Sequence, residues 1–491
     1  MSALACAAEP PIRVQGGLQF PAQSAGEALS GRWTIKGVRV LDPDTGVYRL
    51  RDIRIDGEQI VEVSENLASV DGAELDGTGL YALPGLIDAH VHLASVPGSM
   101  IRGDTEEQLR EQRRLQLRAL LASGVTSVLD CAVPEEMLRE LRAQGAEGHP
   151  SPTVFALGPF LTPAEGYFGT AEQRHSPYDA LEAPIADPAE VEPLMALATK
   201  RPTRGAKVTF EDGLLFSIWP EFDRDTRFEI RDAAKRHDVR VYAHSLDNDA
   251  HRQALETEPY ALVHAGMGSE ALEPDVLEAI RASGAYVITT AAIYELENWT
   301  RERNWTEQSW IKARVPERQW VTALDPDIEA RVTGLAVPIV SPWWMPNAWA
   351  EVFSGWIRDS DSAHEELESS LRAIKALHDA GVPLVLGSDT GNWPAFATFF
   401  HGVGAVVEAE LLERAGLPRL EIIRAATRRA AAMLDVDTLG AVEVGMTADL
   451  VLYPRDPLSD GMRVLREPAW VVSRGEARTP AGWLTGGLRS K

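Results

Sequence analysis

Apolar segments of strand length alternate with amphipathic helical segments from residue 81 onward, and this alternation is the feature that most constrains the fold. It is typical of parallel strands that are connected by helices. The candidate strands are eight: 85–92, 125–130, 153–157, 205–210, 239–244, 260–264, 286–290 and 382–388. Eight strands of this kind predict an α/β fold, a (β/α)8 TIM-like barrel over residues 83–436.

The two ends of the chain differ from this central region. Residues 1–30 have no periodicity and predict a loose N-terminal arm. Strand-like pieces separated by turn signals occur on both sides of the barrel, at 33–41, 48–55, 59–63, 447–453 and 470–472. Because chain termini often lie close together, we expect segments 31–82 and 437–491 to form one small, split β-sandwich domain beside the barrel.

The charge and the cysteine content limit the partners and the compartment. The 491-residue chain has a formal net charge of -25, which argues against nucleic acids and anionic membranes as partners. Only Cys6 and Cys131 occur, so no disulfide framework is expected. We expect a cytoplasmic homo-oligomer. Residues 1–9 resemble the tail of an export signal, so an exported form is the alternative if the N-terminus is a truncated signal peptide.

Side chains that commonly bind metals stand at the carboxyl ends of several predicted strands. His90 and His92 are two residues apart, so they lie on one face of a strand. His244, His264 and Asp389 each end a further strand. Because the carboxyl ends of barrel strands form one mouth, these side chains would meet there and would suit a transition metal. Taken singly, each could instead be a core histidine or a helix cap.

Lys207 interrupts the apolar strand 205–210. A lysine in a buried strand is strongly desolvated unless its amine is neutral or paired. A neutral amine can add carbon dioxide and form a carbamate, an anionic two-oxygen ligand that is able to bridge two metal ions. The alternative is an ion pair between Lys207 and a carboxylate such as Glu211 or Asp212.

Several motifs occur together along most of the chain. They are ALPGLIDAHVH at 82–92, GVTSVLD at 124–130, AKV at 206–208, LGSD at 386–389 and GMTADLV at 445–451, with shorter matches at 401–402, 410–412, 415–417 and 426–427. From about residue 33 to 477 the chain resembles the amidohydrolase superfamily, in the branch of prolidase-like and imidazolonepropionase-like enzymes.

The resemblance implies a binuclear centre with two divalent metal ions, and zinc is the first expectation for this ligand chemistry. The implied ligands form two groups: His90, His92 and Asp389 for one ion, and His244 and His264 for the other. Lys207, carboxylated by carbon dioxide, would bridge the two ions.

The implied reaction is attack on a carbonyl by a hydroxide shared between metal ions about 3.5 to 4 Å apart. Asp389 is the candidate base, which would take the proton of the water and deliver it to the leaving amine. Family members that deaminate bases usually lack the lysine and carry a glutamate just beyond the fifth-strand histidine. Here Lys207 is present, and Ser245 and Leu246 follow His244, so deamination is disfavoured. Leu246 also stands where many prolidase-like relatives have an aromatic residue or histidine, which puts a dipeptide substrate in doubt.

The long interval between the last two predicted strands must carry its own structure, and we expect an insertion at about 291–360. It is rich in tryptophan: Trp299, Trp305, Trp310, Trp320, Trp343, Trp344, Trp349 and Trp356. Core packing, an oligomer interface and a lid over the active-site mouth are all open interpretations. Tyr167 and Tyr294 follow the third and seventh strands and are candidate substrate contacts.

We therefore expect a metal-dependent enzyme that hydrolyses a C–N bond in a small-molecule amide, carbamate, urea or cyclic amide, and not ordinary peptide bonds of proteins. An apolar or aromatic substituent on the substrate is favoured. The first alternative is an esterase or lactonase that uses the same binuclear site, because hydroxide attacks similar carbonyls. The second is a catalytically silent scaffold, which the complete ligand set disfavours.

Overall fold

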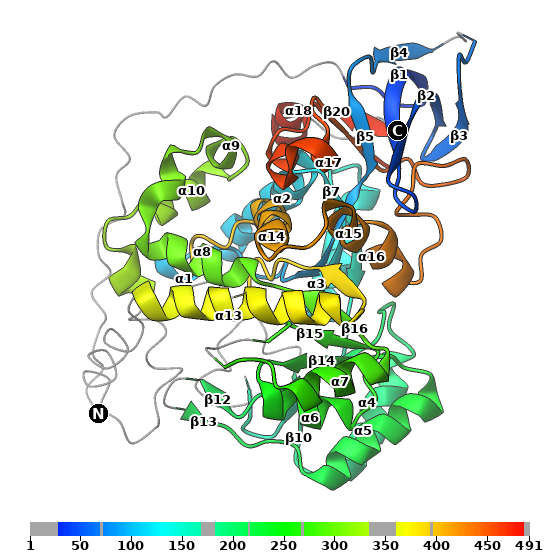
Figure 1. Cartoon of the computed structure of the whole chain (residues 1–491). Coiled ribbons are helices and arrows are strands. Elements are labelled where there is room, and N and C mark those ends of the chain that lie inside the picture. Colours follow the sequence, from blue (N-terminus) through cyan, green and yellow to red (C-terminus); the bar gives the residue numbers. More distant parts are fainter. Residues whose placement is uncertain are drawn as a thin grey trace.

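Eight parallel strands form a closed barrel. The structure is a computed structural model, drawn in Figure 1. It describes residues 28–68, 72–167, 182–214, 217–266, 270–332, 360–392 and 396–485. The barrel fold predicted from the alternating pattern is thereby confirmed, and all eight candidate segments contain a strand. The barrel strands are β6 (Leu86–Val91), β7 (Val125–Asp130), β8 (Thr153–Ala156), β11 (Ala206–Phe210), β14 (Val241–Ser245), β15 (Ala261–Val263), β16 (Tyr286–Thr289) and β17 (Leu384–Leu386).

Backbone hydrogen bonds close the barrel at two seams. The third strand continues beyond β8 as β9 (Phe160–Pro163), which pairs with β11 and with an added strand, β10 (Glu182–Ile185). At the other seam, between β6 and β17, the backbone N–H of Asp389 donates to the His90 carbonyl at 2.8 Å. The sheet therefore closes at a point where two of the predicted metal ligands are backbone neighbours.

Helices connect successive strands and cover the outside of the barrel (Figure 1). They are α1 (Ser99–Arg102), α2 (Glu106–Ala122), α3 (Glu135–Ala146), α4 (Val191–Ala198), α5 (Arg224–His237), α6 (Asn248–Leu255), α7 (Pro274–Ser283), α13 (Ser360–Asp379), α14 (Val403–Arg414), α15 (Arg419–Ala425) and α16 (Arg428–Met433). The Asp247 side chain caps α6 by accepting the Ala250 N–H at 2.8 Å, so this acid, three residues after His244, starts a helix. No helix of the described residues is long and apolar enough to cross a membrane.

Strands from both ends of the chain form one sheet beside the barrel, in the order β20-β19-β18-β5-β1-β2-β3, with β4 paired to β1. They are β1 (Arg32–Asp42), β2 (Val47–Asp56), β3 (Gln59–Ser64), β4 (Ala73–Asp76), β5 (Tyr81–Pro84), β18 (Leu450–Tyr453), β19 (Trp470–Ser473) and β20 (Glu476–Arg478). Trp33 from the first segment and Val472 from the second share one buried core. A division of these strands into the two layers of a sandwich, as a separate domain, stays a prediction.

The last residues of the expected N-terminal arm are paired with the other end of the chain. Leu29 and Ala477 exchange two backbone hydrogen bonds, of 3.0 and 2.9 Å. Leu29, near the end of the expected arm, is therefore held by β20, which offers it an unpaired strand edge. Residues 1–27 of the arm lie outside the described residues.

The described part of the tryptophan-rich insertion consists of α8 (Ala292–Arg301), η3 (Arg303–Glu307), α9 (Ser309–Lys312) and α10 (Glu317–Ala323). Three of its tryptophans pack on one another: the Trp305 ring is stacked 5.7 Å from Trp299 and lies edge-on 5.2 Å from Trp320. All three are buried. The core interpretation therefore holds for these three residues, and Trp343, Trp344, Trp349 and Trp356 lie outside the described residues.

Candidate metal centre

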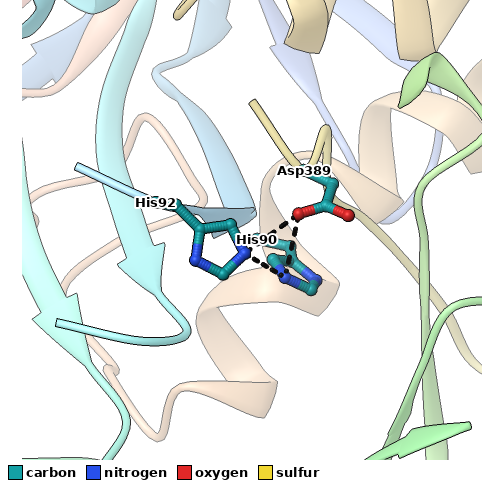
Figure 2. Close-up of side chains that lie close together, drawn as sticks. All are labelled: His90, His92 and Asp389. Carbon is teal, nitrogen blue, oxygen red and sulfur yellow. Dashed lines mark hydrogen bonds and ion pairs between the residues drawn. The ribbon is translucent and has the colours of Figure 1, made fainter. Parts of the chain in front are cut away.

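The closing seam of the barrel brings His90, His92 and Asp389 together (Figure 2). The Nε2 atoms of the two histidines are 3.2 Å apart. Asp389 Oδ1 lies 3.3 Å from His90 Nε2 and 3.0 Å from His92 Nε2. All three side chains are buried. Two strands that pair at their carboxyl ends thus aim three ligand atoms at one point.

The spacing of these three atoms matches the edges of a metal coordination polyhedron. Ligands that bind zinc at about 2.0 to 2.1 Å stand about 3.0 to 3.4 Å from one another in tetrahedral or octahedral sites. Asp389 Oδ1 is buried and has no hydrogen-bond partner among the described residues, so the atom is available for a cation. The donor set therefore fits a divalent transition metal.

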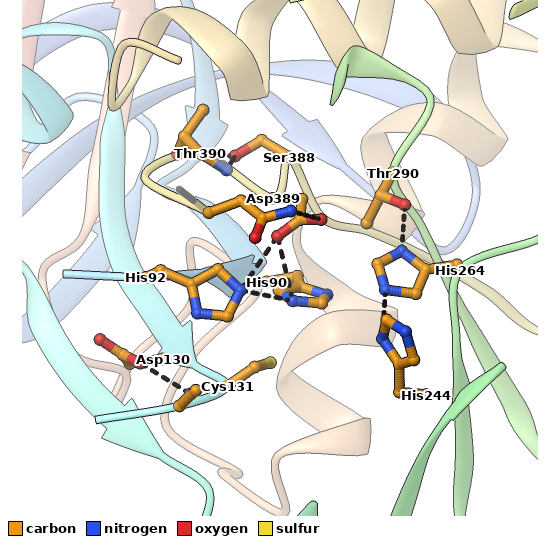
Figure 3. Close-up of polar contacts among 12 residues, drawn as sticks. His90, His92, Asp130, Cys131, His244, His264, Thr290, Ser388, Asp389 and Thr390 are labelled. Carbon is orange, nitrogen blue, oxygen red and sulfur yellow. Dashed lines mark hydrogen bonds and ion pairs between the residues drawn. The ribbon is translucent and has the colours of Figure 1, made fainter. Parts of the chain in front are cut away.

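A second pair of histidines faces this group (Figure 3). His244, on β14, and His264, directly after β15, approach each other with 3.0 Å between His244 Nδ1 and His264 Nε2. The ring of His264 lies 5.1 Å from the ring of His90, so the two groups are adjacent. The structure thus brings together all five of the histidine and aspartate ligands that were expected from the sequence.

Buried side chains hold the second pair in a defined orientation. Glu211 Oε2 lies 2.9 Å from His244 Nε2, and Thr290 Oγ1 lies 2.7 Å from His264 Nδ1. These contacts engage one ring nitrogen of each histidine and leave the other, Nδ1 of His244 and Nε2 of His264, facing the partner ring. Metal-binding histidines are commonly fixed in this way through their second nitrogen.

The imidazoles of His90, His244 and His264 are held in the neutral form that metals bind. Burial lowers the pKa of His90, His244 and His264 well below the ordinary value of 6.5. For His90 and His244 the nearby Lys207 ammonium is the next cause, and for His264 the His244 ring precedes Lys207. Neutral imidazoles offer a lone pair without first having to release a proton.

Two residues of the site have a backbone conformation that side chains rarely adopt. His264 has φ of 78° and Asp389 has φ of 55°, both in the left-handed region. His264 directly follows β15, and Asp389 lies three residues after the end of β17. Strain of this kind is maintained where the surroundings hold it, and it is concentrated at functional sites.

Lys207 lines the same pocket as the five ligands and is 2% exposed. Burial lowers the pKa of its ammonium. No carboxylate of the described residues lies within ion-pair distance of Lys207 Nζ. Glu211, one of the two expected partners, contacts His244, and Asp212 is exposed. The ion-pair alternative for Lys207 therefore finds no support among the described residues, and the amine is buried in the pocket.

Behind the seam between β6 and β17, a buried carboxylate ties the two strands together. Asp88 accepts hydrogen bonds from the backbone N–H and from the hydroxyl of Ser388, at 2.9 and 2.6 Å. It also accepts the His90 N–H at 3.3 Å. Burial raises the pKa of Asp88 to about 7. These contacts fix the backbone that presents His90 and Asp389.

The apolar side of the pocket is made by Ala132, Phe160 and Tyr167. The Tyr167 ring is stacked on the His244 ring with 5.0 Å between centroids and packs edge-on against Trp219 at 5.4 Å. Tyr167 therefore lies on the wall of this pocket, and its role as a substrate contact stays a prediction. Tyr294 is not among the described residues that line this pocket: it lies on α8 and packs in the hydrophobic core.

Three polar neighbours of the ligands were not singled out as site residues from the sequence. Glu211 was considered only as a partner of Lys207, Thr290 only as a strand end, and Asn392 not at all. Asn392 Nδ2 donates to Asp389 Oδ2 at 3.2 Å. The sequence does show that an acid, Glu211, directly follows the predicted strand 205–210. The register that sets Thr209 of this strand opposite His244 is given by the structure.

Comparison with known proteins agrees with this fold. The curated relatives match over short stretches: a dihydroorotase of Streptococcus thermophilus is 40% identical over 70 residues, which are 14% of this chain and 16% of that protein. Among solved structures, a prolidase complexed with N-methylphosphonate-L-proline has a TM-score of 0.66 at 20% identity, and the match covers 90% of this chain and 98% of that one. Phenylurea hydrolase B has a TM-score of 0.66 at 19% identity, covering 94% and 100%. Residues 81–477, most of the chain, match the sequence model of the amidohydrolase family, and the chain belongs to that family.

Proposed function

We propose that this protein is a metal-dependent hydrolase that cleaves a C–N bond in a small molecule. The observation that carries the proposal is the convergence of two ligand groups, with 3.0 to 3.3 Å between neighbouring ligand atoms, on a pocket that also contains the buried amine of Lys207. The names of the solved structures with the same fold, a prolidase and a phenylurea hydrolase, are consistent with C–N cleavage.

The centre would hold two divalent ions, with zinc expected first. His90, His92 and Asp389 would bind one ion, and His244 and His264 the other. Lys207 would join the two groups after its neutral amine adds carbon dioxide: the nitrogen forms a bond to the carbon, one proton leaves, and a carbamate with two oxygens results. Burial favours this step because it lowers the pKa of the amine.

When bound, the metal ions would supply Lewis-acid activation of the substrate carbonyl and of the attacking water. Asp389 would move the proton. Its Oδ1 faces the histidines, whereas Asn392 holds Oδ2 at 3.2 Å and so fixes the plane of the carboxylate. From this position the carboxylate would take a proton from the water and pass it to the leaving nitrogen, which makes the amine a better leaving group.

The side chains of the pocket favour a substrate with an apolar or aromatic group. Phe160 and Ala132 are buried, and Tyr167 places its ring beside His244. A flat substituent could pack on this surface while the scissile carbonyl faces the ligands. The proposed substrates are therefore aryl or alkyl amides, carbamates, ureas and cyclic amides.

Ester or lactone hydrolysis at the same site is the second candidate, because the same groups would activate water against an ester carbonyl. A catalytically silent scaffold is disfavoured, because every predicted ligand position has a side chain that can bind a metal. A homo-oligomer and a cytoplasmic location stay predictions.

One experiment tests the proposal: metal content per chain, followed by turnover of the reconstituted protein on matched amides, carbamates, ureas, esters and lactones. Two metal ions per chain with turnover of the C–N substrates would support it. Turnover of esters or lactones alone would favour the second candidate. One metal ion per chain with deamination of heterocycles alone would contradict both.

A further inference from the structure

A second large groove lies between the α9–α10 connection, the segment that joins β18 to β19, and α18 (Pro480–Thr485), which stand together in Figure 1. Its volume is about 850 Å³, within the usual range of small-molecule sites. It shares no lining residue with the pocket of the candidate metal centre. The groove is therefore a separate cavity, which the proposed hydrolysis does not use.

Arg314 lines this groove and is 6% exposed. A guanidinium has five N–H donors and a permanent positive charge. In the structure one hydrogen bond engages it, from Nη2 to the Arg466 carbonyl at 3.3 Å. No carboxylate of the described residues lies within 4.0 Å of its nitrogens. Most of the donors of Arg314 are therefore left for the groove.

Arg314 is exceptional among the buried arginines of the described chain. The other three each contact a glutamate at 2.5 Å: Arg54 with Glu62, Arg113 with Glu106, and Arg478 with Glu476. This is the usual arrangement, because a buried charge without a partner is strongly destabilising. The fold thus supplies a carboxylate to every buried arginine here except the one that lines a groove.

No carboxylate of the described part of the chain forms an ion pair with Arg314. Burial lowers the pKa of Arg314 to about 10, so it still carries its charge at neutral pH. The other group that acts on it is the hydroxyl of Tyr453, which is neutral at that pH. Glu317 and Glu467 line the groove, but neither forms an ion pair with Arg314.

The remaining surface of the groove combines apolar and charged groups. Trp310, Val315 and Leu484 line it. Arg466 also lines it, but both oxygens of the Glu410 carboxylate bind the Arg466 guanidinium at 2.5 Å. Lys312, Glu317 and Glu467 line the groove as well, and Glu467 is paired with Arg455. The buried cation that a ligand in this groove would meet beside the apolar surface is Arg314.

We propose that this groove binds a small organic anion, namely a carboxylate attached to an apolar group, with the carboxylate paired to Arg314. A guanidinium and a carboxylate form two parallel hydrogen bonds, so the ligand would supply the partner that the fold gives to the other buried arginines. The apolar part of the ligand would pack beside Trp310 and Val315.

The test is calorimetric titration of the full-length protein with 4-phenylbutyrate, with the uncharged 4-phenylbutanol, and with inorganic phosphate. We expect saturable binding of one 4-phenylbutyrate per groove, and at least ten-fold weaker binding of the other two probes. Arg314→Met should weaken 4-phenylbutyrate binding at least ten-fold, and Arg314→Lys should retain part of it. Equal binding of the alcohol, equal binding of phosphate, or unchanged binding by Arg314→Met would each overturn the proposal.

Ala469→Leu keeps Arg314 and adds side-chain volume to the lining of the groove, so it tests the site even if Arg314→Met does not fold. It should also weaken 4-phenylbutyrate binding, while metal content and turnover stay at wild-type values because the two cavities share no residue. Unchanged binding by Ala469→Leu would place the probe elsewhere. If Arg314 is uncompensated, the melting temperature of ligand-free Arg314→Met should equal or exceed that of wild type, and a lower value would show that the fold does pair this charge.

Discussion

Glu211 Oε2 lies 2.9 Å from His244 Nε2, and both side chains are buried. Burial raises the pKa of Glu211 well above its ordinary value, and the neighbouring acids Asp212 and Asp247 raise it further. The carboxyl is therefore costly to keep at this place. We infer that Glu211 has an orienting role. It contacts Nε2 of His244, the ring nitrogen that points away from His264, and so turns Nδ1 towards the proposed metal.

We predict that Glu211→Gln weakens metal binding about 10- to 100-fold, because removal of such outer partners of metal-binding histidines has effects of this size. The glutamine keeps the shape but not the charge. Metal content per chain is measured after dialysis against graded chelator concentrations. Asp212→Asn, a change at the exposed neighbour, is the matched control and should behave as wild type. Equal metal retention by the two variants would exclude the orienting role.

Lys207→Ala should lose bound metal and activity, because it removes the group that would become the bridging carbamate. Acetate or propionate should restore both in part, since a small carboxylate can occupy the space that the lysine leaves in the buried pocket. Lys207→Met is the control: it fills the space without offering a carboxylate, so acetate should not restore it. Full activity of Lys207→Met would contradict the bridging role.

Asp389→Asn should lower kcat by about 10²- to 10⁴-fold, the usual contribution of a positioned acid–base group. Metal should remain bound, because the amide oxygen of asparagine can still act as a ligand and His90 and His92 are unchanged. Metal analysis and steady-state kinetics on the same preparation check both statements. A fully active variant would show that another residue moves the proton.

The barrel and its ligand set could be predicted from the sequence because both follow from local pattern. Apolar runs fix the strands, and the carboxyl ends of parallel strands must meet at one mouth. His90, His264 and Asp389 therefore converge in the structure, and this convergence does not depend on the conformation of the connecting loops. What this pattern cannot predict is which side chains support them, since that depends on the register between strands that are distant in the sequence.

Glu211 and Tyr294 show this limit in opposite ways. Glu211 lies four residues after Lys207, which suggested a local ion pair, but the pairing of Thr209 with His244 carries the Glu211 carboxylate to the neighbouring strand instead. Tyr294 follows a barrel strand, as pocket residues do, yet α8 begins at Ala292 and turns its ring into the core. The sequence contains no signal for that rotation.

Tyr167→Ala should lower kcat/KM for aryl substrates about ten-fold or more, and should affect small alkyl substrates much less. The tyrosine ring is stacked on His244 at the pocket wall, so its removal takes away a surface on which an aryl group would pack. Tyr167→Phe keeps the ring and should retain the aryl preference. Equal losses on aryl and alkyl substrates would mean that Tyr167 supports His244 and does not select the substrate.

Glu408, on α14, gives the structure a pH dependence that can be measured apart from activity. It is fully buried, and its Oε2 accepts the Ala292 N–H at 2.6 Å. Burial raises its pKa from 4.5 to about 7. Between these two pH values the folded protein keeps a proton that the unfolded chain releases, so this group lowers the free energy of unfolding as pH rises from about 4.5 to 7. The loss reaches roughly 3 kcal/mol above pH 7.

Glu408→Gln is neutral at every pH and keeps an oxygen that can accept the Ala292 N–H. At pH 8 the variant should therefore have a higher free energy of unfolding than wild type, and this difference should disappear towards pH 4.5. Urea unfolding of the metal-free protein at both pH values measures it. Glu443→Gln, a change at an exposed site, is the matched control and should follow wild type. A difference between Glu408→Gln and wild type that is the same at both pH values would show that packing, and not the buried proton, separates the two proteins.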